Sequence, residues 1–158
     1  MDYIRTRHSV YLLTYHMIFV TKWRKPCISD EVGDFMVSTA KRLCKGYGGE
    51  LIKGETDTDH IHLLVSLPPD CNVKEIVRNL KTMLSREVHQ NPKVNEHICN
   101  FIHGDVPLWS PSYFIATTGT VSTESIKAYI DSQSTDEHKR KYTKNPVYWN
   151  RRKKQSCT

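Results

Sequence analysis

The spacing of apolar side chains predicts four strands in this chain. Residues 12–21 (LLTYHMIFVT) are rich in β-branched and aromatic types, which is typical of a well-buried strand. Two more strands are predicted at about residues 50–56 and 60–67, joined by a short acidic turn. A fourth strand is predicted within residues 108–119 and is centred on residues 113–117.

Apolar positions at helical spacing predict three helices. The first begins at a cap, Ser29 or Asp30, and runs to about residue 45. The last is expected over residues 123–133, and residues 90–107 are expected to be irregular. The middle helix has the clearest apolar stripe, formed by Val73, Ile76, Val77, Leu80, Leu84 and Val88.

The predicted element order is therefore β-α-β-β-α-β-α. Two helices packed on one face of a four-stranded antiparallel sheet satisfy this order, so the predicted class is α+β, ferredoxin-like or RRM-like, with a further helix at the C-terminal end. Residues 1–150 are expected to form a single domain, followed by a basic tail at residues 151–158.

The charge balance of the chain indicates what kind of partner to expect. The chain of 158 residues has a formal net charge of +6, which favours a polyanionic partner such as nucleic acid. The N-terminal residues do not have the pattern of a secretory signal, and no apolar run is long enough to span a bilayer. We therefore expect a cytoplasmic protein with no membrane partner.

The segment DTDHIHLLVSLPP contains the first candidate site. Side chains alternate along a strand, so His60 and His62 are expected to project from one face, where two neutral imidazoles can hold a divalent ion. The alternative is a pair of hydrogen-bonded histidines on a half-buried strand, because short motifs of this kind also occur by chance. Asp57 or Asp59 could orient an imidazole, or both could belong to an ordinary acidic turn.

Tyr129 and Gln133 form the second candidate site. They are four residues apart on the predicted last helix and so share a face. A tyrosine hydroxyl can attack phosphorus once a nearby cation or base activates it, and the Gln133 amide oxygen can be a neutral metal ligand. The alternative is a core tyrosine next to a surface glutamine.

A basic-aromatic patch follows the first strand, and more basic side chains lie on the middle helix. Basic groups can follow a nucleic-acid backbone while an aromatic ring stacks on a base, although the patch after the strand could also be a solvated strand end. The candidate DNA contacts are Lys22, Trp23, Arg24, Lys25, Arg78, Lys81 and Arg86.

Taken together, four segments in this order resemble the small HUH single-tyrosine transposases, the TnpA-type enzymes of compact prokaryotic insertion sequences. They are YHMIFVTKWRKP, DTDHIHLLVSLPP, LWSPSYFIATTG and IKAYIDSQ, and the resemblance extends over about residues 11–150. The His-hydrophobic-His motif is matched by His60, Ile61 and His62. The resemblance implies that Tyr129 is the nucleophile and Gln133 the third metal ligand.

The resemblance also implies an activity. Such an enzyme binds hairpin ends of an insertion sequence and cleaves and rejoins single-stranded DNA through a 5′-phosphotyrosine, with Mg²⁺ or Mn²⁺ as cofactor. It is expected to be a homodimer in which the tyrosine helix of one chain can complete the site of the other.

Three other classes are compatible with parts of the sequence. A histidine-triad nucleotide hydrolase needs a third alternating histidine, where this chain has Leu64. A non-catalytic RNA-binding module would explain the charge and the sheet, but it has no use for His60, His62 and Tyr129 together. A domesticated descendant that binds hairpin nucleic acid without mobilising a transposon could have the same sequence features.

Overall fold

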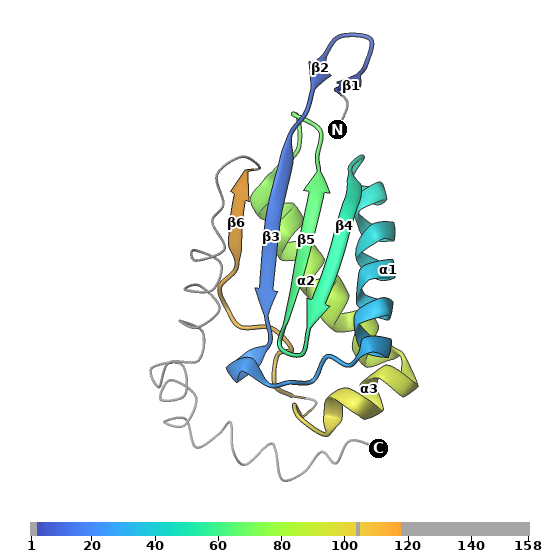
Figure 1. Cartoon of the computed structure of the whole chain (residues 1–158), viewed down its shortest axis with the longest axis vertical. Helices are drawn as coiled ribbons and strands as arrows, with labels where there is room; N and C mark the ends of the chain where they lie inside the picture. The colour runs from blue at the N-terminus through green and yellow to red at the C-terminus, as the bar shows by residue number, and fades with distance from the viewer. Residues whose placement is uncertain (1–2, 104, 118–158) are drawn as a thin grey trace.

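The computed structural model describes residues 3–103 and 105–117, and their centre is an antiparallel sheet (Figure 1). The strand order is β4-β5-β3-β6, so β5 and β3 are the two central strands. This order confirms the predicted ferredoxin-like sheet. Its strands are β3 (Thr14–Val20), β4 (Glu50–Asp57), β5 (His60–Ser66) and β6 (Phe114–Thr117).

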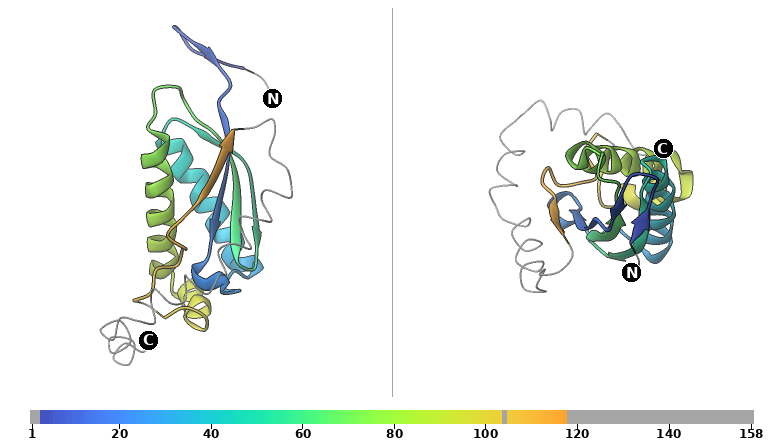
Figure 2. Two further views of the ribbon diagram at one scale, coloured as in Figure 1. Left: turned by 90° about the vertical axis from the view of Figure 1, so that its left-hand side faces the viewer. Right: turned by 90° about the horizontal axis from the view of Figure 1, so that it is seen from above.

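Two long helices, α1 (Asp30–Gly46) and α2 (Val73–Gln90), lie on the same side of the sheet (Figure 2). The Ser29 hydroxyl accepts a hydrogen bond from the Val32 backbone amide, which confirms the predicted start of α1. The predicted α+β class is confirmed. No helix in the described ranges is long and apolar enough to cross a membrane.

A short third helix, α3 (Pro92–Cys99), corrects the expectation that residues 90–107 are irregular. Asn91 is both the C-terminal cap of α2 and the N-terminal cap of α3. Its backbone amide donates to the carbonyl of Glu87 at the end of α2, and its side chain accepts from the Val94 amide at the start of α3. Proline at the first helical position fits because that amide needs no partner. The predicted helix at residues 123–133 lies outside the described residues.

A small hairpin before the sheet was not predicted. Strands β1 (Ile4–Arg5) and β2 (Val10–Tyr11) pair with each other and extend beyond the end of the sheet (Figure 1). Its turn is closed by the Thr6 amide, which donates to the Ser9 carbonyl. Strands of two residues are too short to show an alternating pattern in the sequence.

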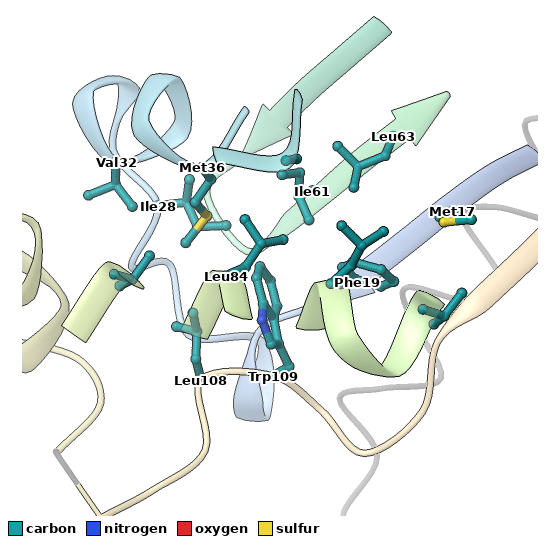
Figure 3. Close-up of a cluster of buried hydrophobic side chains, with 14 of the residues drawn as sticks. Met17, Phe19, Ile28, Val32, Met36, Ile61, Leu63, Leu84, Leu108 and Trp109 are labelled. Carbon is teal, nitrogen blue, oxygen red and sulfur yellow. The ribbon is translucent and has the colours of Figure 1, made fainter. Parts of the chain in front are cut away.

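The main core lies between the sheet and the two long helices. Met17 and Phe19 of β3 and Ile61 and Leu63 of β5 are all fully buried there (Figure 3). The Phe19 ring meets Trp109 edge-on, with the ring centroids 5.9 Å apart. The interior face of the two central strands is therefore apolar throughout, and it fixes their position from behind.

Candidate active site on the histidine face

The two histidines of the His-hydrophobic-His motif are on the face of β5 that points away from α1 and α2. Ile61, Leu63 and Val65 alternate with them and are fully buried on the helix side. His60 and His62 are half-buried. We call this opposite side of the sheet, which carries His16, His60 and His62, the histidine face.

Asp59 orients the imidazole of His60. Its Oδ1 lies 2.8 Å from Nδ1 of His60, and its Oδ2 accepts a 2.7 Å hydrogen bond from Nε of Arg24. Burial alone would raise the pKa of the Asp59 carboxyl, but the hydrogen bonds and charges of His60 and Arg24 outweigh burial and lower it. Asp57, the other acidic candidate, instead accepts from the Thr58 amide at 2.6 Å.

His62 has a different neighbour, His16 of β3. Nε2 of His62 lies 2.9 Å from Nδ1 of His16, across the diagonal between the paired strands. Burial, followed by the charge of His16, lowers the pKa of the His62 imidazole. His62 is therefore held in the neutral form that metals bind.

His16 was not among the predicted site residues. A polar imidazole in the otherwise apolar segment YHMIFV was the signal available in the sequence. The strand register, which the sequence does not specify, decides that His16 meets His62.

The donor set fits one part of a divalent-metal site. A proton on Nδ1 of His60, donated to Asp59, leaves the Nε2 lone pair available for a metal. For His62, binding through Nε2 requires its contact with His16 to break. Within residues 3–103 and 105–117, no group of three or more His, Cys, Asp or Glu side chains is placed to hold a metal. The described part of the chain therefore offers two imidazoles as candidate ligands.

A hollow of about 690 Å³ is lined by side chains of α1 between Gly33 and Lys41, by β4 residues 54–57 and by His60 and His62. Two glycines let these elements approach closely. A Cβ on Gly33 would lie 2.2 Å from Oγ1 of Thr56, and one on Gly54 would lie 2.9 Å from a methyl group of Val37. The hollow places open space next to His60 and His62, where a substrate could reach them.

The two lysines Lys22 and Lys81, both predicted DNA contacts, have side chains directed into the protein. The Lys22 side chain is buried, and the residue is only 1 % exposed. The Lys81 amine donates to the carbonyl oxygens of Ser110, Pro111 and Ser112 at 2.7–3.3 Å. Burial, with a smaller effect of Lys22, lowers the pKa of Lys81 to about 8. We therefore do not propose Lys22 or Lys81 as DNA contacts.

The remaining basic candidates are divided between two places. Lys25 is exposed in the turn that follows β3, and Trp23 beside it is half-buried. Arg78 and Arg86 are exposed on α2, which lies on the other side of the sheet from the two histidines. The structure therefore does not bring the α2 arginines to the histidine pair. Tyr129 and Gln133 lie outside the described residues.

Comparison with known proteins identifies the family. Residues 9–133, which include the histidine pair, match the family of IS200-like transposases. The chain belongs to that family. This transposase is 33 % identical over 132 residues to the ISDra2 transposase TnpA of Deinococcus radiodurans, covering 83 % of this chain and 91 % of the relative. It is 25 % identical over 126 residues to the IS200 transposase of Salmonella typhimurium, covering 80 % of each.

A solved structure agrees with this assignment. A crystal structure from Deinococcus radiodurans, of a protein assigned as a transposase, superposes with a TM-score of 0.69 at 30 % identity. It covers 82 % of this chain and 97 % of that one. The protein is thus an IS200-like transposase, an enzyme class that cleaves DNA.

Proposed function

We propose that this transposase binds hairpin ends of an insertion sequence and cleaves and rejoins the adjacent single strand through Tyr129. The observation that carries the proposal is the placement of His60 and His62 on one face of a rigid strand, with Asp59 fixing His60. Sites held on strands with buried backing keep their geometry better than sites on loops. The match to the transposase family covers Tyr129 and Gln133 as well.

In the proposed reaction the Tyr129 oxygen attacks the scissile phosphorus, and the bond from phosphorus to the 3′-oxygen breaks. The products are a 5′-phosphotyrosine and a DNA strand with a free 3′-hydroxyl. A second 3′-hydroxyl can then attack the phosphotyrosine, so rejoining needs no ATP. Mg²⁺ or Mn²⁺ bound by His60, His62 and Gln133 would polarise the phosphate and stabilise its developing charge.

The test is an assay with a labelled, hairpin-flanked oligonucleotide. The wild-type protein should form an SDS-resistant adduct, and EDTA should prevent it until Mg²⁺ or Mn²⁺ is added back. Tyr129→Phe should bind the hairpin and form no adduct, since only the hydroxyl is removed. Cleavage by the Phe variant would show that the nucleophile is another residue. Hairpin binding by the wild-type protein without any cleavage would instead support the alternative, a domesticated or non-catalytic hairpin-binding protein.

We also propose a homodimer with shared sites, on the strength of the resemblance of the IKAYIDSQ segment. The apolar sequence of the first predicted strand (YLLTYHMIFV) could also indicate burial at a two-fold interface, but Ile18 and Val20 are already fully buried with Phe114 packed against them, so this strand adds no support for a dimer. Mixing Tyr129→Phe protein with the His60→Ala/His62→Ala double variant, each inactive alone, tests the arrangement. Shared sites restore part of the activity after subunit exchange, whereas sites built within one chain restore none.

A further inference from the structure

The turn after β3 has an unfavourable backbone conformation. Trp23 and Arg24 have φ values of +55° and +52°, in the left-handed region that side chains other than glycine rarely adopt. Such conformations persist only where the surrounding contacts hold them, and they concentrate at functional sites.

The base of the turn is fastened to Asp59. The Thr21 amide donates to the Asp59 carbonyl at 2.8 Å, and the Thr21 hydroxyl lies 2.8 Å from the Lys25 carbonyl and 3.0 Å from that of Asp59. Past the turn, the Ile28 amide donates to the Thr58 carbonyl at 2.9 Å. Residues 21–28 therefore lie alongside the tight turn between β4 and β5. That turn directly precedes His60 in the chain.

The left-handed turn brings Arg24 to the carboxylate that orients His60. Arg24 Nε and His60 Nδ1 bind different oxygens of Asp59, so the carboxylate bridges the two side chains. The Asp59 side chain is only 11 % exposed, and a carboxylate this deeply buried needs such partners to stay ionised and fixed in orientation.

We propose that Arg24 is a positioning residue for His60 and acts through Asp59, rather than a contact to DNA. Arg24 fixes the Asp59 carboxylate, Asp59 holds the proton on Nδ1 of His60, and Nε2 is left as the metal-binding nitrogen. The inference deepens the proposed function and rests on His60 being a metal ligand. In this role Arg24, in the basic turn after β3, supports the metal centre.

Lys25 is the matched control, because it is exposed and carries the same charge in the same turn. A role in DNA binding predicts that Arg24→Gln and Lys25→Gln weaken hairpin binding alike. A positioning role predicts that Arg24→Gln and Asp59→Asn weaken metal binding while Lys25→Gln does not.

The experiment is titration of the full-length, DNA-free protein with Mn²⁺ in a calorimeter. Arg24→Gln and Asp59→Asn should each reduce Mn²⁺ affinity by about 10- to 100-fold, the usual effect of removing a group that orients a ligand. The Arg24→Gln/Asp59→Asn double variant should be no weaker than Asp59→Asn alone, because both act along one chain of contacts. Unchanged affinity in Arg24→Gln, or fully additive losses in the double variant, would overturn the proposal.

A second measurement separates this inference from the proposed function. In metal-free protein labelled with ¹⁵N-histidine, NMR should show His60 protonated on Nδ1, and the signal should change in Arg24→Gln but not in Lys25→Gln. If the wild-type protein binds no Mn²⁺ and cuts no DNA, the proposed function fails. The tautomer of His60 would still show whether Arg24 acts on His60 through Asp59. Should Arg24→Gln fail to fold, Arg24→Lys takes its place, since a lysine amine keeps the charge but cannot reproduce the guanidinium geometry. In that variant an unaltered His60 tautomer and unaltered Mn²⁺ affinity would overturn the proposal.

Discussion

The two faces of strands β3 and β5 differ sharply, although the same backbone carries both. On the helix side Met17, Phe19, Ile61 and Leu63 are fully buried and form the centre of the core. On the histidine face the same strands present three imidazoles with hydrogen-bonded neighbours, beside a smaller apolar cluster of Ile18, Val20 and Phe114. The helix face supplies rigidity and the histidine face supplies chemistry, so substitutions on the two faces should have separable effects.

The largest expected effect is on activity. The His60→Ala/His62→Ala double variant should reduce cleavage to background, because it removes both imidazoles proposed to bind the metal. Its free energy of unfolding should change by only about 1 kcal/mol or less, since neither side chain is part of the apolar core. Gel assays and denaturant unfolding of the same preparations measure the two quantities. A large loss of stability would mean that the histidines are structural.

The helix face should show the opposite result. Leu63→Ala, next to His62 but facing the core, should lower the free energy of unfolding by about 2–5 kcal/mol, because it leaves a cavity among fully buried side chains. At a temperature where the variant is still folded, its Mn²⁺ affinity should stay close to that of the wild type. A variant of normal stability with impaired metal binding would contradict the separation of the faces.

The sequence predicts the helix face better than the histidine face. Periodic apolar residues were sufficient to place α1, α2 and the four strands of the sheet, since burial determines those positions. The short helix α3 was missed because only Val94, Ile98 and Cys99 mark its buried side and Asn91 alone separates it from α2. The hairpin of β1 and β2 has too few residues to show any period.

On the histidine face the sequence identified the residue types but not their partners. His60 and His62 were placed on one face by strand alternation, whereas the contact with His16 depends on the register between β3 and β5. The sequence left Asp57 and Asp59 as equal candidates, and only the path of residues 21–28 brings Arg24 to Asp59. Lys22 and Lys81 looked like surface charges because pattern alone cannot show that the fold buries the Lys22 side chain or that the Lys81 amine finds backbone carbonyl acceptors.

The next effect concerns a polar contact on the helix side. Lys81→Met should destabilise the protein by about 1–3 kcal/mol, since three backbone carbonyls lose their donor. The lowered pKa of Lys81 gives the pH dependence. Between the folded value of about 8 and the ordinary value near 10.5, the unfolded chain binds more protons. Raising the pH through this window should therefore stabilise the wild-type protein relative to Lys81→Met. Denaturant unfolding at several pH values measures the difference in free energy of unfolding between the wild type and Lys81→Met. If this difference became smaller as the pH rises, the lowered pKa of Lys81 would be contradicted.

The smallest effect is expected at Lys53 on the edge strand β4. A register shift between Leu51 and Lys53 pairs Lys53 with Leu64 and so places it on the side of the sheet opposite to Leu51. Its amine is 2.7 Å from the Glu55 carboxylate, but both side chains are more than half exposed, so solvent screens the pair. Lys53→Gln should therefore shift Tm by less than about 2 °C, within the range of an exposed ion pair in a chain of this size. Leu51→Ala is the matched comparison, because Leu51 is 7 % exposed and belongs to the core. Its Tm should fall well below that of Lys53→Gln in the same calorimetric scan. Equal shifts would mean that the edge strand is not divided into a buried and a solvent side, and the contrast between the faces would then be limited to β3 and β5.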